Sequence, residues 1–157
     1  MIRNIWPRVM LLAGLGLAGC SHFDQQWKAP LPLTSHEAAL PLSGRWDGTW
    51  QSQDSHGDGG LRAIIVPVES PAPGTAPQRY QANFQAVFMG GLKADYTLEM
   101  TTTYTGLGRI KFQGSKDLGP LGGGVYTYEG EAVNGDMTVR YTSANDHGTF
   151  TMKHVMP

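Results

Sequence analysis

The sequence of 157 residues contains a single cysteine, Cys20, so no disulfide can form within the chain. Cross-linking is what holds together many small secreted domains whose core is too small to be stable alone. A chain of this length can bury a sufficient core without such help. The fold is therefore expected to depend on burial and hydrogen bonding.

The sequence also lacks a hydrophobic stretch long enough to cross a bilayer. An apolar and glycine run extends from Val9 to Gly19, after a short segment that carries Arg3 and no acid. A spanning helix needs about 20 apolar residues, whereas a basic start and a shorter apolar run are typical of a cleaved signal. Residues 1–19 are therefore predicted to be a signal peptide.

Charged residues are few, at 16% of the chain, and the formal net charge is −1. Loss of Arg3 and Arg8 with the signal changes it to about −3, which gives no electrostatic attraction for nucleic acid. The chain has no Gly-x-Ser-x-Gly, no His-Glu-x-x-His and no glycine-rich loop that opens a helix. We expect neither an enzyme nor a bound cofactor.

Metal ligands are equally sparse. Asp54, His56 and Asp58 alternate in a glycine-rich stretch, but Asp and Gly are the residues that turns require, and we predict no metal site there. His147, in a later turn, and His154, near the C-terminus, are expected to be solvated.

What the sequence does have is a specific context for its cysteine. Leu17-Ala18-Gly19-Cys20 follows the apolar run and resembles the lipobox of bacterial lipoproteins. The resemblance implies that Cys20 receives a diacylglycerol and becomes the acylated N-terminus after cleavage. Only a thiolate is nucleophilic enough for that attachment, and several acyl chains on one residue anchor a protein firmly. Ser21 after the cysteine implies an outer-membrane location facing the periplasm.

The next segment, 20–42, is predicted to be a tether between the lipid and the domain. Prolines at positions 30, 32 and 41 favour an extended, semi-rigid spacer. Thr34 and Glu37 form a capping-box pattern, so a single helical turn over Ser35 to Leu40 is the other interpretation of part of it.

From residue 43 to residue 157 the apolar residues alternate with period two, and turn residues recur at short intervals. The pattern predicts an antiparallel all-β domain rather than helices. Asn134-Gly135 is its strongest hairpin signal. The expected strands are 44–52, 61–68, 79–88, 93–102, 109–114, 125–133, 136–143 and 148–154.

Eight such strands can bury their apolar faces by closing into a small barrel, which also removes the unpaired sheet edges. An up-and-down barrel is the first prediction and a two-sheet sandwich the alternative. Gly44-x-Trp46 at the first strand resembles the start of lipocalins and related calycins, which implies that Trp46 closes one end of the barrel. The length is nearer to that of avidin-like barrels.

A second resemblance covers most of the domain. Trp46-x-Gly48-x-Trp50-x-Ser52, the stretch HGDGGLRAI and the ending GDMTVRYTSANDHGTFTM are similar to a family of bacterial secreted and lipoprotein domains. This resemblance implies a fold and no activity.

Two functions are compatible with these features. Aromatic residues interleaved with small ones could line a cavity for a small hydrophobic or amphipathic ligand. In the alternative, the same residues fill the barrel and the loops 54–60, 69–78 and 114–124 contact a protein partner of the envelope. The candidate ligand-binding residues are Trp46, Trp50, Tyr80, Phe84, Tyr96, Tyr126 and Tyr128.

The anchor gives a direct prediction. Replacing Cys20 with Ser removes the acyl acceptor, so the protein should leave the membrane fraction while its circular dichroism spectrum stays that of a β-domain. Fractionation of cells that express either form measures this. A Cys20→Ser protein that still sedimented with membranes through its mature domain would contradict the anchor.

Overall fold

The computed structural model of the chain describes residues 21–54, 57–69, 72 and 79–156. Cys20 with the predicted lipobox, His56 and nearly all of the loop 70–78 lie outside the described residues. In the part of the chain that is described, no helix has the length and hydrophobicity to span a membrane.

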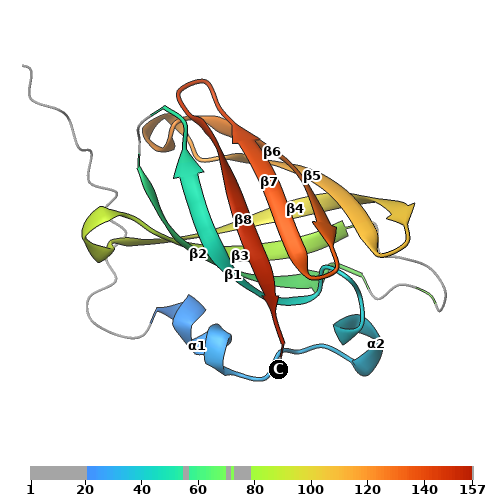
Figure 1. The fold of residues 1–157 in the computed structure, drawn as a ribbon. Coiled ribbons are helices and arrows are strands. Elements are labelled where there is room, and N and C mark those ends of the chain that lie inside the picture. The colour runs from blue at the N-terminus through green and yellow to red at the C-terminus, as the bar shows by residue number, and fades with distance from the viewer. Residues whose placement is uncertain (1–20, 55–56, 70–71, 73–78, 157) are drawn as a thin grey trace, which may run out of the picture.

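Eight antiparallel strands follow one another in sequence order and close into a barrel (Figure 1). The strands are β1 (Gly44–Ser52), β2 (Asp58–Pro67), β3 (Arg79–Val87), β4 (Lys93–Gly106), β5 (Arg109–Asp117), β6 (Val125–Val133), β7 (Asp136–Thr142) and β8 (His147–Val155). Short helices are α1 (His22–Lys28), α2 (Ser35–Ala38), η1 (Met89–Gly91) and η2 (Pro120–Gly122).

The predicted up-and-down barrel is confirmed, and the sandwich does not form. Closure comes from β1, which pairs with β2 on one side and with β8 on the other. The register places Trp46 opposite Ala63 of β2 and His154 of β8. Every strand therefore has two neighbours, and every second side chain points to the interior.

The interior contains the residues that alternation predicted. Along β3, for example, Tyr80, Ala82, Phe84 and Ala86 are all buried. Phe88 was expected to continue this inward row, but β3 ends at Val87 and the Phe88 side chain is 41% exposed. Phe88 therefore lies just beyond the end of the strand, at the edge of the barrel.

One end of the barrel is closed by Trp46, which is fully buried as the calycin resemblance implied. Its indole N–H donates to the Leu42 carbonyl at 3.0 Å, and its ring meets the His154 ring edge-on at a centroid distance of 5.1 Å. The His154 Nε2 lies 3.0 Å from the Ser43 carbonyl oxygen. His154, expected to be solvated, is thus half-buried because it packs against Trp46.

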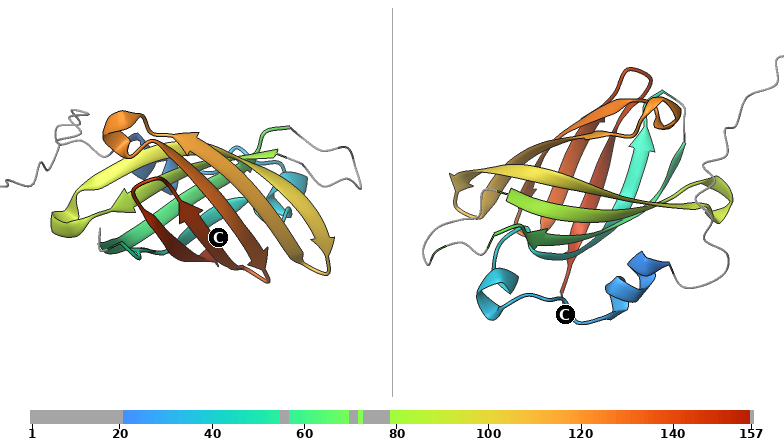
Figure 2. Two further views of the ribbon diagram at one scale, coloured as in Figure 1. Left: turned by 90° about the horizontal axis from the view of Figure 1, so that it is seen from above. Right: turned by 180° about the vertical axis from the view of Figure 1, so that it is seen from behind.

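The segment 22–43 differs from the extended spacer that its prolines favoured. The first part forms α1, which lies outside the barrel, below the strands in the right-hand view of Figure 2. Phe23 is buried and stacks on Trp27, and the Arg62 guanidinium lies 5.2 Å from the Trp27 ring centre. The spacing of these two aromatics by four residues gives α1 an apolar face that packs on the barrel.

The N-terminal segment also buries one residue on the outer face of the barrel. Alternation along β3 places Gln85 on the outer face, yet it is buried, and its side-chain amide donates to the Ser21 hydroxyl at 3.1 Å. Farther along, the capping box of Thr34 and Glu37 is present and begins the short helix α2. The helical interpretation of that turn is confirmed.

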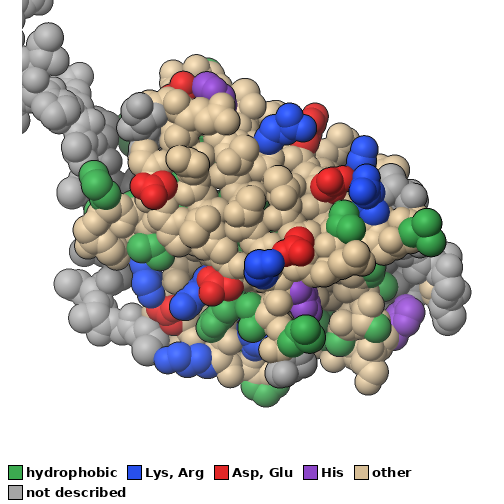
Figure 3. Space-filling model, viewed as in Figure 1, with side chains coloured by type: hydrophobic (Ala, Val, Ile, Leu, Met, Phe, Trp, Pro, Cys, Tyr) green, Lys and Arg blue, Asp and Glu red, His purple; other side chains and the backbone are tan. Residues whose placement is uncertain are grey.

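The outer face carries charges of both signs. Figure 3 shows them interspersed over the strands, with hydrophobic side chains at the left-hand edge over the connection between β3 and β4. Arg79, for example, pairs with Glu69 and Glu99 at 2.6 and 3.1 Å. Exposed pairs of this kind add little stability, so the barrel depends on its interior.

Strand closure depends on a close backbone approach at Gly48. A Cβ atom built there would lie 1.9 Å from the Thr151 carbonyl oxygen of β8, whereas one at Gly60 would make only ordinary contacts with Val87 at 3.8 Å. Gly48→Ala should therefore lower the free energy of unfolding by about 1–3 kcal/mol through overpacking. Gly60→Ala should change it by much less, and urea unfolding of both variants measures the difference. Equal effects would show that closure tolerates a side chain at this point.

Candidate functional site

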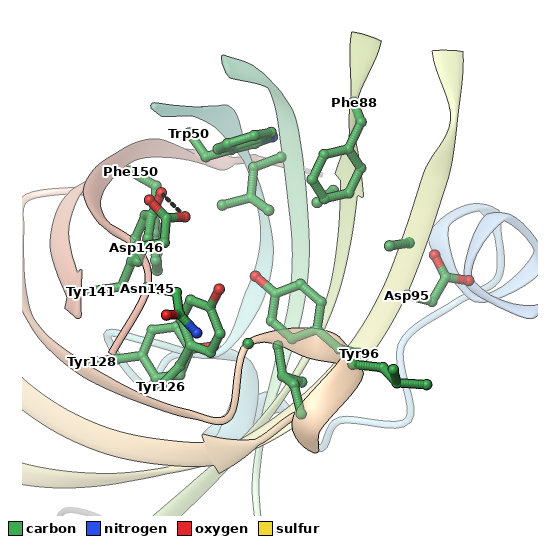
Figure 4. Close-up of a pocket in the computed structure, with 16 residues that line it drawn as sticks. Trp50, Phe88, Asp95, Tyr96, Tyr126, Tyr128, Tyr141, Asn145, Asp146 and Phe150 are labelled. Atoms are coloured by element: carbon green, nitrogen blue, oxygen red, sulfur yellow. Dashed lines mark hydrogen bonds between the residues drawn. The ribbon is translucent and has the colours of Figure 1, made fainter. Parts of the chain in front are cut away.

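The end of the barrel opposite Trp46 contains a cavity of about 580 Å³. Its walls come from β1, β2, β3, β4, β6, β7 and β8 together with the connections 88–92, 118–124 and 143–146. The lining residues are Trp50, Leu61, Ala86, Phe88, Ala94, Asp95, Tyr96, Leu118, Leu121, Gly123, Tyr126, Tyr128, Tyr141, Asn145, Asp146 and Phe150. Figure 4 shows the labelled side chains arranged around this space.

Aromatic rings make most of the wall and are packed against one another. Tyr96 stacks on Phe84 at a centroid distance of 5.2 Å, and Tyr128 contacts Phe150 edge-on at 6.5 Å. Trp50 packs against Phe88 at 5.0 Å, and its N–H donates to the Val87 carbonyl. These contacts fix the rings, so the cavity has a preformed shape.

The tyrosine hydroxyls are the main polar groups inside. Tyr96 reaches in from β4, and Tyr126 and Tyr128 lie on the facing side of the cavity (Figure 4). Within the described part of the chain, the hydroxyls of these three residues make no hydrogen bond. Each keeps a donor and an acceptor for a molecule in the cavity.

One carboxylate at the cavity is held in a fixed position. The Ser52 hydroxyl donates to Asp146 Oδ1 at 2.6 Å, and the Tyr141 hydroxyl donates to Asp146 Oδ2 at 3.4 Å. Asp95 is the other acid of the lining. Lysine and arginine are absent from the described lining residues, so nothing there would neutralise an anionic ligand.

Burial favours the neutral form of Tyr96, Tyr128 and Tyr141. It raises the pKa of the Tyr128 hydroxyl to about 12, with a smaller contribution from Tyr126. Burial raises the pKa of Tyr96 well above its ordinary value, and that of Tyr141 too, where the Asp146 carboxylate also disfavours the phenolate. These groups therefore act as neutral donors and acceptors over the physiological pH range.

The sequence-based candidates divide into two groups. Trp50, Tyr96, Tyr126 and Tyr128 line the cavity. Trp46, Tyr80 and Phe84 are buried core residues and do not, because alternation identifies an inward face without its depth along the barrel axis. Tyr80 pairs with Met100 across β3 and β4, and its buried hydroxyl has no partner among the described residues.

Sequence reasoning missed the cavity residues that lie in the connections. Leu118 and Leu121 come from the segment expected as the loop 114–124, of which β5 extends to Asp117. Asp146 also lines the cavity and lies in the connection between β7 and β8, where an acid is an ordinary turn residue. One feature of the sequence could have indicated these residues. The glycine-rich connections contain apolar side chains, whereas a connection that only faces solvent would carry polar ones.

The remaining candidates for chemistry lie near the same end. Asp54, the first residue of the alternating Asp and His pattern, accepts from the His147 backbone N–H at 2.8 Å and lies 2.6 Å from its Nδ1. His147, expected to be solvated, is thus half-exposed and paired. His56 lies outside the described residues, and the described ones contain no group of three or more side chains suited to a metal ion.

Comparison with known proteins identifies no family for this chain. The sequence matches no model of a known protein family and no curated protein. The structure is similar to the crystal structure of Rv2717c from M. tuberculosis, with a TM-score of 0.45 and 12% identity over 74% of this chain and 94% of that chain.

Two mutants of the fluorescent protein UnaG, in which one asparagine is replaced, are similar as well. The alanine mutant has a TM-score of 0.40 and 12% identity over 74% of this chain and 98% of that one. The glutamine mutant has a TM-score of 0.37 and 11% identity over 73% of this chain and 96% of that one. The resemblance to secreted bacterial domains stays a sequence-based interpretation.

The raised pKa of Tyr128 predicts an alkaline loss of stability. The hydroxyl titrates near pH 10 in the unfolded chain and near 12 in the fold, so its contribution is complete below pH 10 and is lost between about 10 and 12. Tyr128→Phe should make the fall in the free energy of unfolding over this range shallower. Unfolding curves at stepped pH measure it. An identical slope in both proteins would show that Tyr128 ionises freely in the fold.

Proposed function

We propose that the protein is a non-enzymatic binding module, held at a membrane by a lipid on Cys20, that takes a small hydrophobic or amphipathic molecule into its barrel. The observation that carries the proposal is the cavity of about 580 Å³ with a ring-lined wall and inward tyrosine hydroxyls. Its volume lies in the range of small-molecule sites, which are mostly apolar with a few placed polar groups.

The chemistry of the lining defines the class of ligand. Aromatic faces suit a ring system or a flat apolar body, and the hydroxyls of Tyr96, Tyr126 and Tyr128 suit a few oxygen or nitrogen atoms on it. A buried anion without a partner is costly, and the described lining offers Asp95 and Asp146 but no cation. The ligand is therefore neutral or cationic.

The location follows from the sequence. The lipobox supports a lipid-anchored protein of the cell envelope, in the outer membrane and facing the periplasm. An apolar ligand has low solubility in the aqueous space, so a tethered cavity would hold it near the membrane between its source and its destination.

The alternative is an accessory protein with a solid core that contacts an envelope partner through its loops. The cavity favours the binding module, since the barrel interior is packed at the Trp46 end and open at the other. No described contact specifically supports a protein partner.

Two fluorescent probes with the same ring system test the ligand class. N-phenyl-1-naphthylamine is neutral, and 8-anilino-1-naphthalenesulfonate adds one sulfonate. A chain that starts at Ser21 keeps every contact described above, and it should bind the neutral probe at least tenfold more tightly than the anionic one. Titration followed by probe and tryptophan fluorescence measures both.

Matched variants locate the binding. Ala94 lines the cavity, so Ala94→Trp should weaken binding of the neutral probe at least tenfold, whereas Leu107→Trp, at the fully exposed β4–β5 tip, should leave it unchanged. Circular dichroism checks that both variants are folded. Equal affinity of the two variants, or tighter binding of the sulfonate, would contradict the proposal.

A further inference from the structure

We propose that the rim of the cavity inserts into the surface of a lipid bilayer, so that the barrel opens toward the membrane. The apolar rim is defined by six exposed hydrophobic residues in the two connections that flank the opening. They are Phe88, Met89 and Leu92 between β3 and β4, and Leu118, Leu121 and Val125 between β5 and β6 or at the start of β6.

The exposure of this rim is large for a soluble surface. Met89 is 85% exposed, Leu92 is 71% exposed and Leu121 is 70% exposed. Both connections contribute to one cavity, through Phe88 from the first and Leu118 and Leu121 from the second, so both lie at its opening. Contiguous exposed apolar residues beside a cavity mark a binding surface rather than ordinary scatter.

The path of the chain identifies the lipid bilayer as the partner. Ser21, the residue after the predicted acylation site, accepts a hydrogen bond from Gln85, and Asp24 pairs with Lys93 at 3.0 Å. Gln85 and Lys93 lie on either side of the β3–β4 connection that carries Met89. At about 3.3 Å per strand residue, Phe88 is roughly 10 Å from Gln85.

The N-terminus therefore leaves the barrel at the open end and not at the Trp46 end. Burial of Phe23 and the ion pair of Asp24 hold α1, so this exit is fixed by the fold. Acyl chains on the neighbouring Cys20 would enter the bilayer beside the apolar rim. The orientation rests on the anchor of the proposed function, whereas the rim itself is independent of it.

The consequence is a direct route for an apolar ligand. With the rim in the interface, a molecule could pass between the bilayer and the tyrosine-lined cavity without crossing water. Transfer would then depend on contact with the membrane, and the closed Trp46 end would face away from it.

Depth-dependent quenching tests the insertion with the full lipidated protein in phosphatidylethanolamine and phosphatidylglycerol vesicles. Because Cys20 is the only cysteine and is consumed by acylation, a single introduced cysteine can carry a nitrobenzoxadiazole label. The labelled positions are Met89 and Leu92 on the rim and Leu107 as the control. Leu107 is equally apolar and fully exposed, but lies in the β4–β5 turn at the other end.

Nitroxide-labelled lipids should quench the label at Met89→Cys and Leu92→Cys at least threefold more than at Leu107→Cys. A further substitution of Met89→Asp in the Leu92→Cys protein should reduce that quenching toward the control value. Quenching that is equal at the three positions, or stronger at Leu107, would overturn the proposal.

The outcomes separate this inference from the ligand-binding proposal. Neither Met89 nor Leu92 lines the cavity, so binding of N-phenyl-1-naphthylamine by the chain from Ser21 is a separate measurement. Probe binding without rim quenching would overturn the insertion alone. Rim quenching without probe binding would overturn the ligand proposal and leave the insertion standing.

Discussion

The pairing of β1 with β8 is the interaction on which the rest of this structure depends. Each strand has one apolar and one polar face, and a chain of hairpins left open would expose two sheet edges and one side of its apolar face. The β1–β8 ladder, from Arg45 opposite Val155 to Ser52 opposite Gly148, removes both edges. The backbones of β1 and β8 approach so closely at Gly48 that a side chain there would meet the Thr151 carbonyl oxygen.

Closure gives the two ends different structures. At one end the Leu42 carbonyl and the His154 ring hold Trp46 inside the barrel, and the interior is filled. At the other end the inward residues are large rings, and the hydroxyls of Tyr96, Tyr126 and Tyr128 have no hydrogen-bond partner among the described residues. Packing Tyr96 and Tyr128 more tightly would bury their hydroxyls without hydrogen bonds, which is costly. The composition of that end therefore favours a space over a packed core.

Much of this could be predicted from the sequence. The alternation of apolar and polar residues predicts the bounds of β1 and β6 that the structure shows. Hairpin signals such as Asn134-Gly135 predict that neighbouring strands are antiparallel. Period two specifies which face is inside, but not how far along the axis a residue lies. For that reason Tyr80 and Phe84 were grouped with Tyr96, although they belong to the core and only Tyr96 lines the cavity.

The residues missed by the sequence depend on contacts between distant segments. Nothing near Gln85 indicates that α1 will cover it, because the partner lies more than 60 positions away, at Ser21. His154 looked solvated for the same reason, since its partner Trp46 is on the first strand. No helix forms at Pro30 and Pro32, but these prolines carry no information about the amphipathic helix α1 before them.

The packing of the N-terminal segment on the barrel, rather than its length, determines where the predicted anchor lies relative to the apolar rim and the cavity. An extended tether would let the barrel turn freely and would give the apolar rim no preferred partner. Because α1 is packed on the barrel by Phe23 and Trp27, Ser21 is held on the surface beside Gln85, one residue after the predicted acylation site. Under the proposed anchor, so short a connection would restrict the orientations that the barrel can adopt at a membrane. The exposed side chains of Met89 and Leu92 lie on the end that this restriction would turn toward the lipid.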